Sequence, residues 1–225
     1  MARLQSTLLI CLLANIAPLS AQPTDYARLA ETGHCPGCNL SGADLSGMRL
    51  MSADLSGADL RDASLRQTTL FRAKLSGADL RGANLDKASL GRVDFSDANL
   101  AGLDLSGARL GRARLSGAIL TGSRLDRATL SHADLSNTEM TGVSLVGADL
   151  RNAKLTGSRL DQARLDEADL RQVDLSVVTG LSDTSFIGSR AQRAVFDGLD
   201  LSGCRFDRAQ LDFGSFRGAV LNGAS

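Results

Sequence analysis

The chain has 225 residues, of which 25 are acidic and 25 are basic, and its formal net charge is +0 at pH 7. A balanced chain has no overall field to attract it to nucleic acid or an anionic membrane, so function classes that depend on strong net charge are excluded. With no tryptophan and one tyrosine, we expect a narrow core built from leucine and alanine.

Residues 1–21 have the pattern of a signal peptide. Arg3 supplies a short basic start, an apolar run follows from Leu8 to Ala17, and small residues lead to a cleavage site expected after about Ala21. The run is too short to span a bilayer comfortably, although an uncleaved anchor or a buried helix remains open. We therefore expect an exported protein, periplasmic or extracellular, with no membrane span in the mature chain.

Residues 22–37 are predicted to form a cap segment, with a short helix over residues 23–31. Thr24 is a candidate N-cap, and Gly33 is expected to end the helix. Such a helix would cover the start of the next segment through an apolar stripe consisting of Tyr26, Leu29 and Ala30.

A Cys35-Pro36-Gly37-Cys38 motif ends this segment. In an oxidising compartment it is a disulfide candidate. Zinc would need about four ligands, whereas the motif and His34 offer three. Redox activity would need a βαβ context that the sequence lacks, and free thiols also remain open. We predict no metal and no cofactor.

Residues 38–177 repeat with a period of five. A large apolar residue returns every fifth position from Leu40, and the position two residues earlier is mostly alanine and otherwise cysteine, serine, threonine, valine, leucine or methionine. In a helix, positions five apart would drift around the axis, and in one strand they would alternate between faces. The chain must therefore turn at every unit. Glycine, as at Gly42 and Gly57, recurs two residues after the apolar position, where a turn would need positive φ.

These units resemble the pentapeptide-repeat proteins, whose consensus is A-[D/N]-L-X-X. Ala43-Asp44-Leu45, Ala58-Asp59-Leu60 and Ala83-Asn84-Leu85 match it directly. The resemblance implies an all-β fold, a right-handed quadrilateral β-helix (β-solenoid) of about nine coils, with four units to each 20-residue coil. It also implies that the central residue faces the core. The core-facing candidates are Leu45, Leu60, Leu80, Leu110, Leu135, Leu150, Leu175, Phe196, Phe206 and Phe216.

Charges that recur at every fourth unit agree with that coil. The residues before leucine on one face alternate in sign, and the residues after leucine form a matching serine and threonine row. Like charges in neighbouring strands would be destabilising, so both rows are predicted to be stacking ladders. The charge ladder consists of Asp54, Lys74, Asp94, Arg114, Asp134, Lys154 and Asp174.

Near residues 177–183 the register slips by one residue. We expect one solenoid over residues 38–225 with a bulge or longer turn at the slip, and a domain boundary is the alternative. Beyond the slip, Phe186 should stack near Phe206, and a second pair, Phe196 and Phe216, should lie on the opposite wall. Cys204 takes an inward small position.

No catalytic residue is predicted, and the chain is expected not to be an enzyme. The best candidate contact patch is Met51 with Phe71, which lie four units apart and should stack. We expect a structural or protein-interaction scaffold with an unknown protein partner, and an uncovered last coil also suggests end-to-end self-association. Some relatives mimic duplex DNA and occupy a topoisomerase, but neutral charge, the signal peptide and the absence of a terminal dimer helix disfavour that alternative. Ligand or ice binding along the serine row is weaker still, because the neighbouring charges would disrupt an ordered water array.

Overall fold

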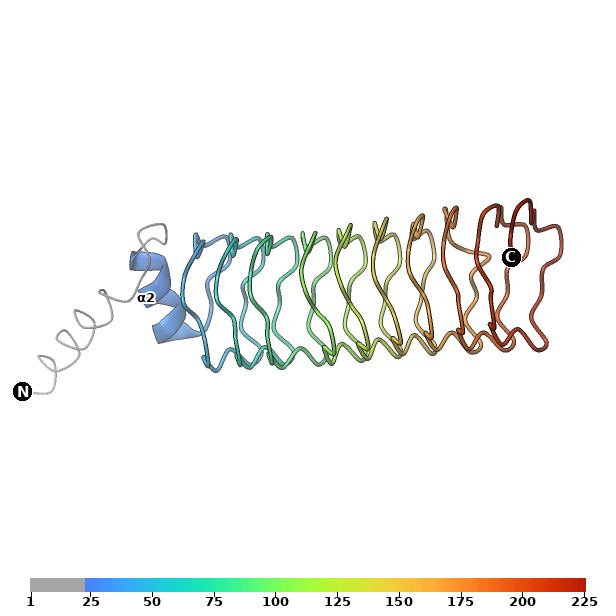
Figure 1. Cartoon of the computed structure of the whole chain (residues 1–225). Helices are drawn as coiled ribbons and strands as arrows, with labels where there is room; N and C mark the ends of the chain where they lie inside the picture. Colours follow the sequence, from blue (N-terminus) through green and yellow to red (C-terminus); the bar gives the residue numbers. More distant parts are fainter. Residues whose placement is uncertain (1–22) are drawn as a thin grey trace, which may run out of the picture.

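The computed structural model describes residues 23–225, and the predicted signal peptide lies outside them. One helix, α2 (Pro23–Thr32), lies at the N-terminal end of a straight rod of stacked coils (Figure 1). Within the described range, no helix has the length and apolar character needed to cross a membrane. Each face of the rod contributes a short extended segment with a single parallel bridge to the next coil, in place of a long strand.

Four repeat units make one coil over most of the rod. Parallel bridges join equivalent residues of successive coils, such as Asp54 with Lys74 and Asp134 with Lys154. The N–H of the central leucine donates to a carbonyl of the next coil, as in the 2.8 Å bond from Leu55 to Lys74. The quadrilateral β-helix expected from the repeat is therefore confirmed, and each coil is held mainly by main-chain hydrogen bonds to its two neighbours.

The turns explain the consensus residues around each leucine. The residue before leucine accepts a hydrogen bond from the backbone two residues on, as Asp44 Oδ1 does from the Ser46 N–H at 3.0 Å. Asp and Asn favour this Asx turn. The second residue after leucine has positive φ as expected, and it does so even where it is not glycine, for example at Asp62 (φ 58°) and Arg72 (φ 60°).

The interior is filled by the central residues and the small residues before them. Most of the predicted core residues are at most 1% exposed, and only Phe206 and Phe216, in the last coil, are partly buried. The phenylalanines stack in two columns, with ring centroids 5.0 Å apart between Phe186 and Phe206 and 4.7 Å apart between Phe196 and Phe216. The two columns meet edge-to-face across the interior at 5.8 Å.

The register slip is a β-bulge at Thr179 and Gly180. The Thr179 N–H donates to the Ser158 carbonyl at 2.8 Å, whereas the Gly180 carbonyl accepts from the Leu160 N–H at 2.9 Å. Two residues of this coil therefore oppose Arg159 alone, which defines a bulge. Residues bridged across it are one position further apart in sequence than in a regular coil, and the regular separation returns in the last coil. Pairing therefore continues through the slip on most faces, although in the described structure it is interrupted between Lys154 and Asp174 and between Gly180 and Asp200.

The longest interruption in the described part of the wall covers two adjacent faces, whereas the two interruptions near the bulge each lack a single bridge. Among the described residues, the bridges expected between Asn84 and Asp104 and between Ser89 and Arg109 are missing, although the flanking pair Asp94 and Arg114 is bridged. Here Leu103 occupies an inward position that holds alanine in most units, and it is 3% exposed. A larger side chain in such a row forces its surroundings apart. The opening coincides with this added volume, to which we attribute the separation of the two coils.

Candidate functional site

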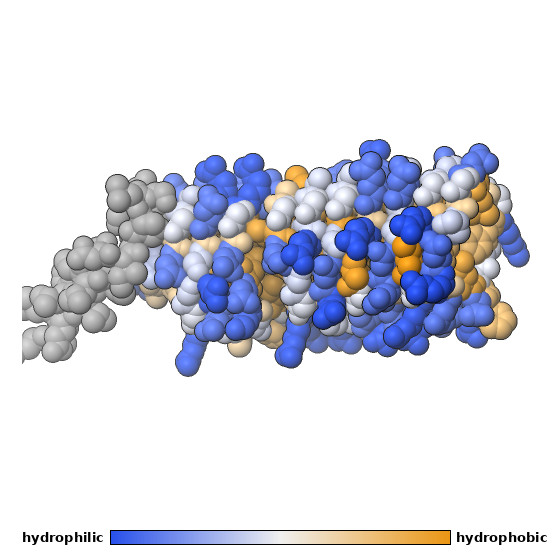
Figure 2. Space-filling view, in the orientation of Figure 1, coloured by the Kyte–Doolittle hydropathy of each residue, from blue (hydrophilic) through white to orange (hydrophobic). Residues whose placement is uncertain are grey.

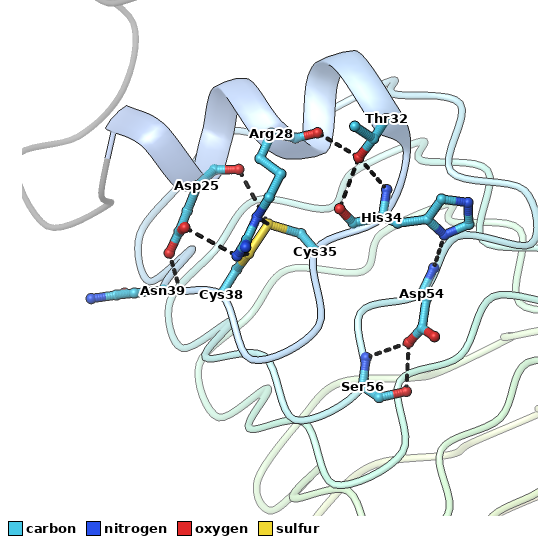
Figure 3. Close-up of a disulfide and its surroundings, with 9 residues drawn as sticks. All are labelled: Asp25, Arg28, Thr32, His34, Cys35, Cys38, Asn39, Asp54 and Ser56. Atoms are coloured by element: carbon cyan, nitrogen blue, oxygen red, sulfur yellow. Dashed lines mark hydrogen bonds and ion pairs between the residues drawn. A yellow bond between two sulfur atoms is a disulfide. The ribbon is translucent and has the colours of Figure 1, made fainter.

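The N-terminal cap is tied to the first coil around a disulfide (Figure 3). The sulfur atoms of Cys35 and Cys38 are joined, and both residues are buried. Leu29 is 1% exposed and Tyr26 packs against the core, so two residues of the expected apolar stripe cover the coil. The third, Ala30, is exposed, because the helix turns that position to solvent.

The ends of α2 differ in how well the sequence predicts them. The helix begins at Pro23, so the prediction of Thr24 as N-cap is wrong, since that residue already lies in the first turn. The C-terminal end is as expected. Gly33 has φ 70°, and its N–H donates to the Leu29 carbonyl at 2.8 Å.

Polar side chains of α2 hold the segment that carries the disulfide. The Asp25 carboxylate accepts the Asn39 N–H at 2.8 Å and pairs with Arg28 at 3.2 Å. The Arg28 guanidinium also lies against both sulfur atoms, with Nε 3.3 Å from Cys35 Sγ. Asp25 and the two cysteines could together offer three metal ligands. A metal would need the reduced thiolates, and the adjacent guanidinium would oppose a second cation, so these residues do not fit a metal site.

The predicted charge ladder forms on one face of the rod from Asp54 to Lys154, whereas its last predicted member, Asp174, has no bridge or ion pair with Lys154 in the described structure. Lys74 Nζ lies 3.8 Å from the Asp54 carboxylate, and the next such pairs along the face are Arg114 with Asp94 at 3.6 Å and Lys154 with Asp134 at 4.0 Å. Beside it, Ser76 Oγ donates to Ser56 Oγ at 3.2 Å, as expected for the serine row. Hydrogen bonds from Ser56 hold the pKa of the Asp54 carboxyl below its ordinary value.

Two pairs of like charges also stack, which the alternating ladder did not predict. Asp59 lies beside Asp79, and Asp149 lies beside Asp169. Each carboxylate is paired with an arginine two residues later in its own coil, as in the 2.6 Å contact between Arg61 and Asp59. Arg61 also reaches Asp79 at 3.9 Å, so it neutralises the neighbouring coil as well.

The predicted contact patch lies at one corner near the N-terminal end. The Ser52 N–H donates to the Phe71 carbonyl at 3.0 Å, so Met51 and Phe71 occupy the same corner of adjacent coils. Met51 is 62% exposed. The Phe71 ring is partly buried, with the Arg72 guanidinium 5.4 Å from its centroid. The corner therefore offers one free apolar side chain and one engaged ring, and the contact patch stays a prediction.

Apolar residues gather again at the other end of the rod, where Figure 2 shows hydrophobic colouring. Phe213, Val220 and Leu221 are exposed there, by 88%, 44% and 49%. Cys204, one coil earlier, is fully buried, and its thiol contacts the Leu181 carbonyl at 3.0 Å. Burial raises the pKa of the Cys204 thiol to about 11, so little thiolate is present at neutral pH.

Sequence reasoning missed two local features. The contact of Arg28 with the disulfide depends on how α2 lies against the coil, which no periodicity encodes. The opening beside Leu103 left a trace in the sequence, because leucine is the largest aliphatic exception in the small-residue row, but the pattern alone did not assign it a consequence.

Comparisons with known proteins agree on one family. The pentapeptide-repeats model matches residues 37–70, 73–112, 108–145, 144–176 and 181–223. HetL of the cyanobacterium Nostoc sp. strain PCC 7120, a pentapeptide repeat protein involved in heterocyst differentiation regulation, is 32% identical, with a TM-score of 0.53 over 85% of this chain and 84% of that one. No curated protein gives a significant match.

Two further solved structures match with lower structural similarity. A pentapeptide repeat protein of the Arabidopsis thaliana thylakoid lumen is 32% identical over 48% of this chain and 70% of that one, with a TM-score of 0.31. The plasmid-mediated fluoroquinolone resistance protein QnrB1 is 19% identical over 81% of this chain and 90% of that one, with a TM-score of 0.32.

Proposed function

The chain belongs to the pentapeptide-repeat family of right-handed quadrilateral β-helices, and from this premise we propose that it is an exported, non-catalytic scaffold that binds a protein partner. The observation that carries the proposal is the arrangement of its ionic side chains. Those of the charge ladder and of the stacked aspartates are satisfied within the rod, as in the pairs Asp54 with Lys74 and Asp59 with Arg61. A surface whose charges are already paired favours binding of a partner through shape and exposed main-chain groups. It does not favour catalysis on a substrate.

Export is part of this proposal and has its own test. The basic start, apolar run and small-residue exit of residues 1–21 support it. We expect residues 1–30, fused to an alkaline phosphatase reporter, to give activity outside the cytoplasm, and a fusion of residues 22–30 to give none. Cytoplasmic retention of the longer fusion would contradict export.

A partner is tested by capture from the exported fraction with the purified rod. The expected result is a stoichiometric partner that also binds when purified. The DNA-mimic alternative requires inhibition of supercoiling by a topoisomerase. The alternating signs at Asp94, Arg114 and Asp134 argue against it, because duplex DNA presents charge of one sign. Inhibition at stoichiometric concentration would replace the scaffold proposal.

Self-association through the C-terminal coil is a second part of the proposal. Phe213, Val220 and Leu221 expose apolar surface at that end, whereas α2 covers the other end. Because α2 covers the other end, we expect a second copy to meet this coil with its own equivalent coil, which would give a closed two-fold dimer and no filament. Sedimentation velocity should show a dimer that Leu221→Lys dissociates. A monomer at high micromolar concentration would refute this part.

A further inference from the structure

The opening beside Leu103 exposes main-chain groups of two neighbouring coils. We call it the wall gap and define it as the stretch in which residues 82–92 face residues 101–111 without ladder hydrogen bonds. A cavity of about 880 Å³ lies there, lined by residues 82–89 and 104–109. The inward alanines Ala88 and Ala108, which are counterparts of fully buried residues elsewhere, are only partly buried at its edge.

The two coil edges that border the wall gap, which we call its lips, both carry main-chain N–H and carbonyl groups without partners among the described residues. On the first coil, among the described residues, no backbone partner is found for the N–H groups of Leu85 and Lys87 or for the carbonyls of Ala83 and Ala88. On the second coil the same holds for the Asp104 and Arg109 N–H groups and for their carbonyls. Alternating donors and acceptors are complementary to an extended peptide backbone. A simple anion would leave every carbonyl unpaired.

The side chains around the wall gap supply a net positive charge. Four exposed cations there take part in no ion pair with the described residues; they are Lys87, Arg92, Arg109 and Arg112. Two nearby carboxylates are paired with neighbouring coils, Asp86 with Arg66 at 3.0 Å and Asp104 with Arg124 at 3.4 Å. A third, Asp62, lies beside Gly82 and has no ion pair with the described residues, so the four free cations outnumber one free carboxylate. The charge that is free to meet a ligand is therefore basic.

We propose that the wall gap binds an extended, acidic peptide segment of a partner protein, which is inserted as an additional strand between the two coils. The main chain of the segment would pair with both lips, and its carboxylates would meet the four cations. This inference deepens the proposed interaction role and rests on it for its biological meaning. The gap is bounded, because the ladder closes again at Asp79 with Asn99 and at Asp94 with Arg114. The segment is therefore limited to the length of about two repeat units.

The test uses purified protein lacking residues 1–21 and a fluorescein-labelled eight-residue peptide in which glutamate alternates with threonine and valine. We expect saturable binding by fluorescence anisotropy, together with slower hydrogen exchange at the Leu85 and Lys87 amides. A peptide with lysine in place of glutamate should not bind. A peptide N-methylated at alternate residues keeps its carboxylates but loses donors, and its affinity should fall by at least about tenfold.

Two kinds of variant separate the wall gap from general attraction. Leu103→Ala removes the wedge and should weaken binding of the peptide by at least about tenfold, whereas Val143→Ala, in a closed part of the same wall, should not. If Leu103→Ala fails to fold, Lys87→Glu with Arg109→Glu provides the same test, and Arg127→Glu with Arg208→Glu is the control of equal charge change.

Three results would overturn the proposal: no binding of the acidic peptide, equal binding of its N-methylated form, or equal loss of binding in the variants and their controls. Failure of this inference remains distinct from failure of the scaffold proposal. If the exported partner is captured equally by the wild type and by Leu103→Ala, the interaction role stands and the wall gap is not its site.

Discussion

Two leucine-to-alanine substitutions at buried positions should differ sharply in their effect on stability. Leu60 is fully buried between closed coils, since the Leu40 N–H donates to the Asp59 carbonyl and the Leu60 N–H donates to the Asp79 carbonyl, and replacing it with alanine removes core packing worth about 2–5 kcal/mol. Leu103 is 3% exposed, and replacing it with alanine loses a similar amount of core packing. The replacement also removes the side-chain volume that holds the two coils apart. Each ladder hydrogen bond that re-forms contributes about 0.5–1.5 kcal/mol, so four re-formed bonds return about 2–6 kcal/mol. Leu103→Ala should therefore be close to neutral or stabilising.

Urea unfolding followed by circular dichroism measures the difference directly. The free energy of unfolding should fall by about 2–5 kcal/mol for Leu60→Ala and change little for Leu103→Ala, with unchanged m-values. Hydrogen exchange at the Leu85 and Lys87 amides should slow in Leu103→Ala as the wall closes. Equal destabilisation of the two variants, with no added protection, would refute the assignment of Leu103 as the cause of the opening.

Three further outcomes are expected. Hydrogen bonds lower the pKa values of Asp54 and Asp59, so the stability that these carboxylates contribute is complete above the unfolded-state pKa of about 3.9 and is lost as pH falls through the folded-state pKa values. The urea midpoint of unfolding should therefore stay constant from pH 8 to about 5 and decrease below about pH 4. A midpoint that rises on acidification would contradict this. The Cys204 thiol should not react with Ellman's reagent in the native chain lacking residues 1–21 and should react once urea unfolds it, because burial raises its pKa to about 11. Deleting Thr179 removes the bulge and restores the five-residue spacing, so stability should change by no more than about 1 kcal/mol, whereas deleting Ser116 from a regular coil should abolish cooperative unfolding.

The sequence predicts the coil well because the same interaction is repeated along it. A leucine such as Leu55 recurs in the same environment at each unit, and the alternating row from Asp54 fixes the four-unit stacking that a five-residue period leaves open. Positive φ at the turn was predicted from glycines such as Gly57. At Arg72 the main-chain pattern of the coil imposes it despite the side chain.

What the sequence does not predict depends on contacts that occur only once. Arg28 approaches the disulfide only because α2 crosses the end of the first coil. The wall gap depends on whether the coils can absorb the added volume of Leu103, and Val143, another exception to the alanine row, is accommodated without a break. A rule that any side chain larger than alanine opens the wall therefore fails, since the outcome depends on the added volume and on how far the neighbouring walls can yield.

The strict stacking of coils also determines how this rod can change over generations. Because Leu55 donates only to the following coil and each later coil repeats that contact, duplication or loss of one whole coil within the regular part leaves every surface row aligned. Only the length changes, by about 4.8 Å for each coil. A duplication of a single repeat unit would move every later unit to the next face of the rod. A duplication between Asp94 and Arg114 would therefore break their alternation. Gain or loss of whole coils can thus change the length of the rod in fixed steps. The distance between its two ends can therefore evolve independently of its surface chemistry.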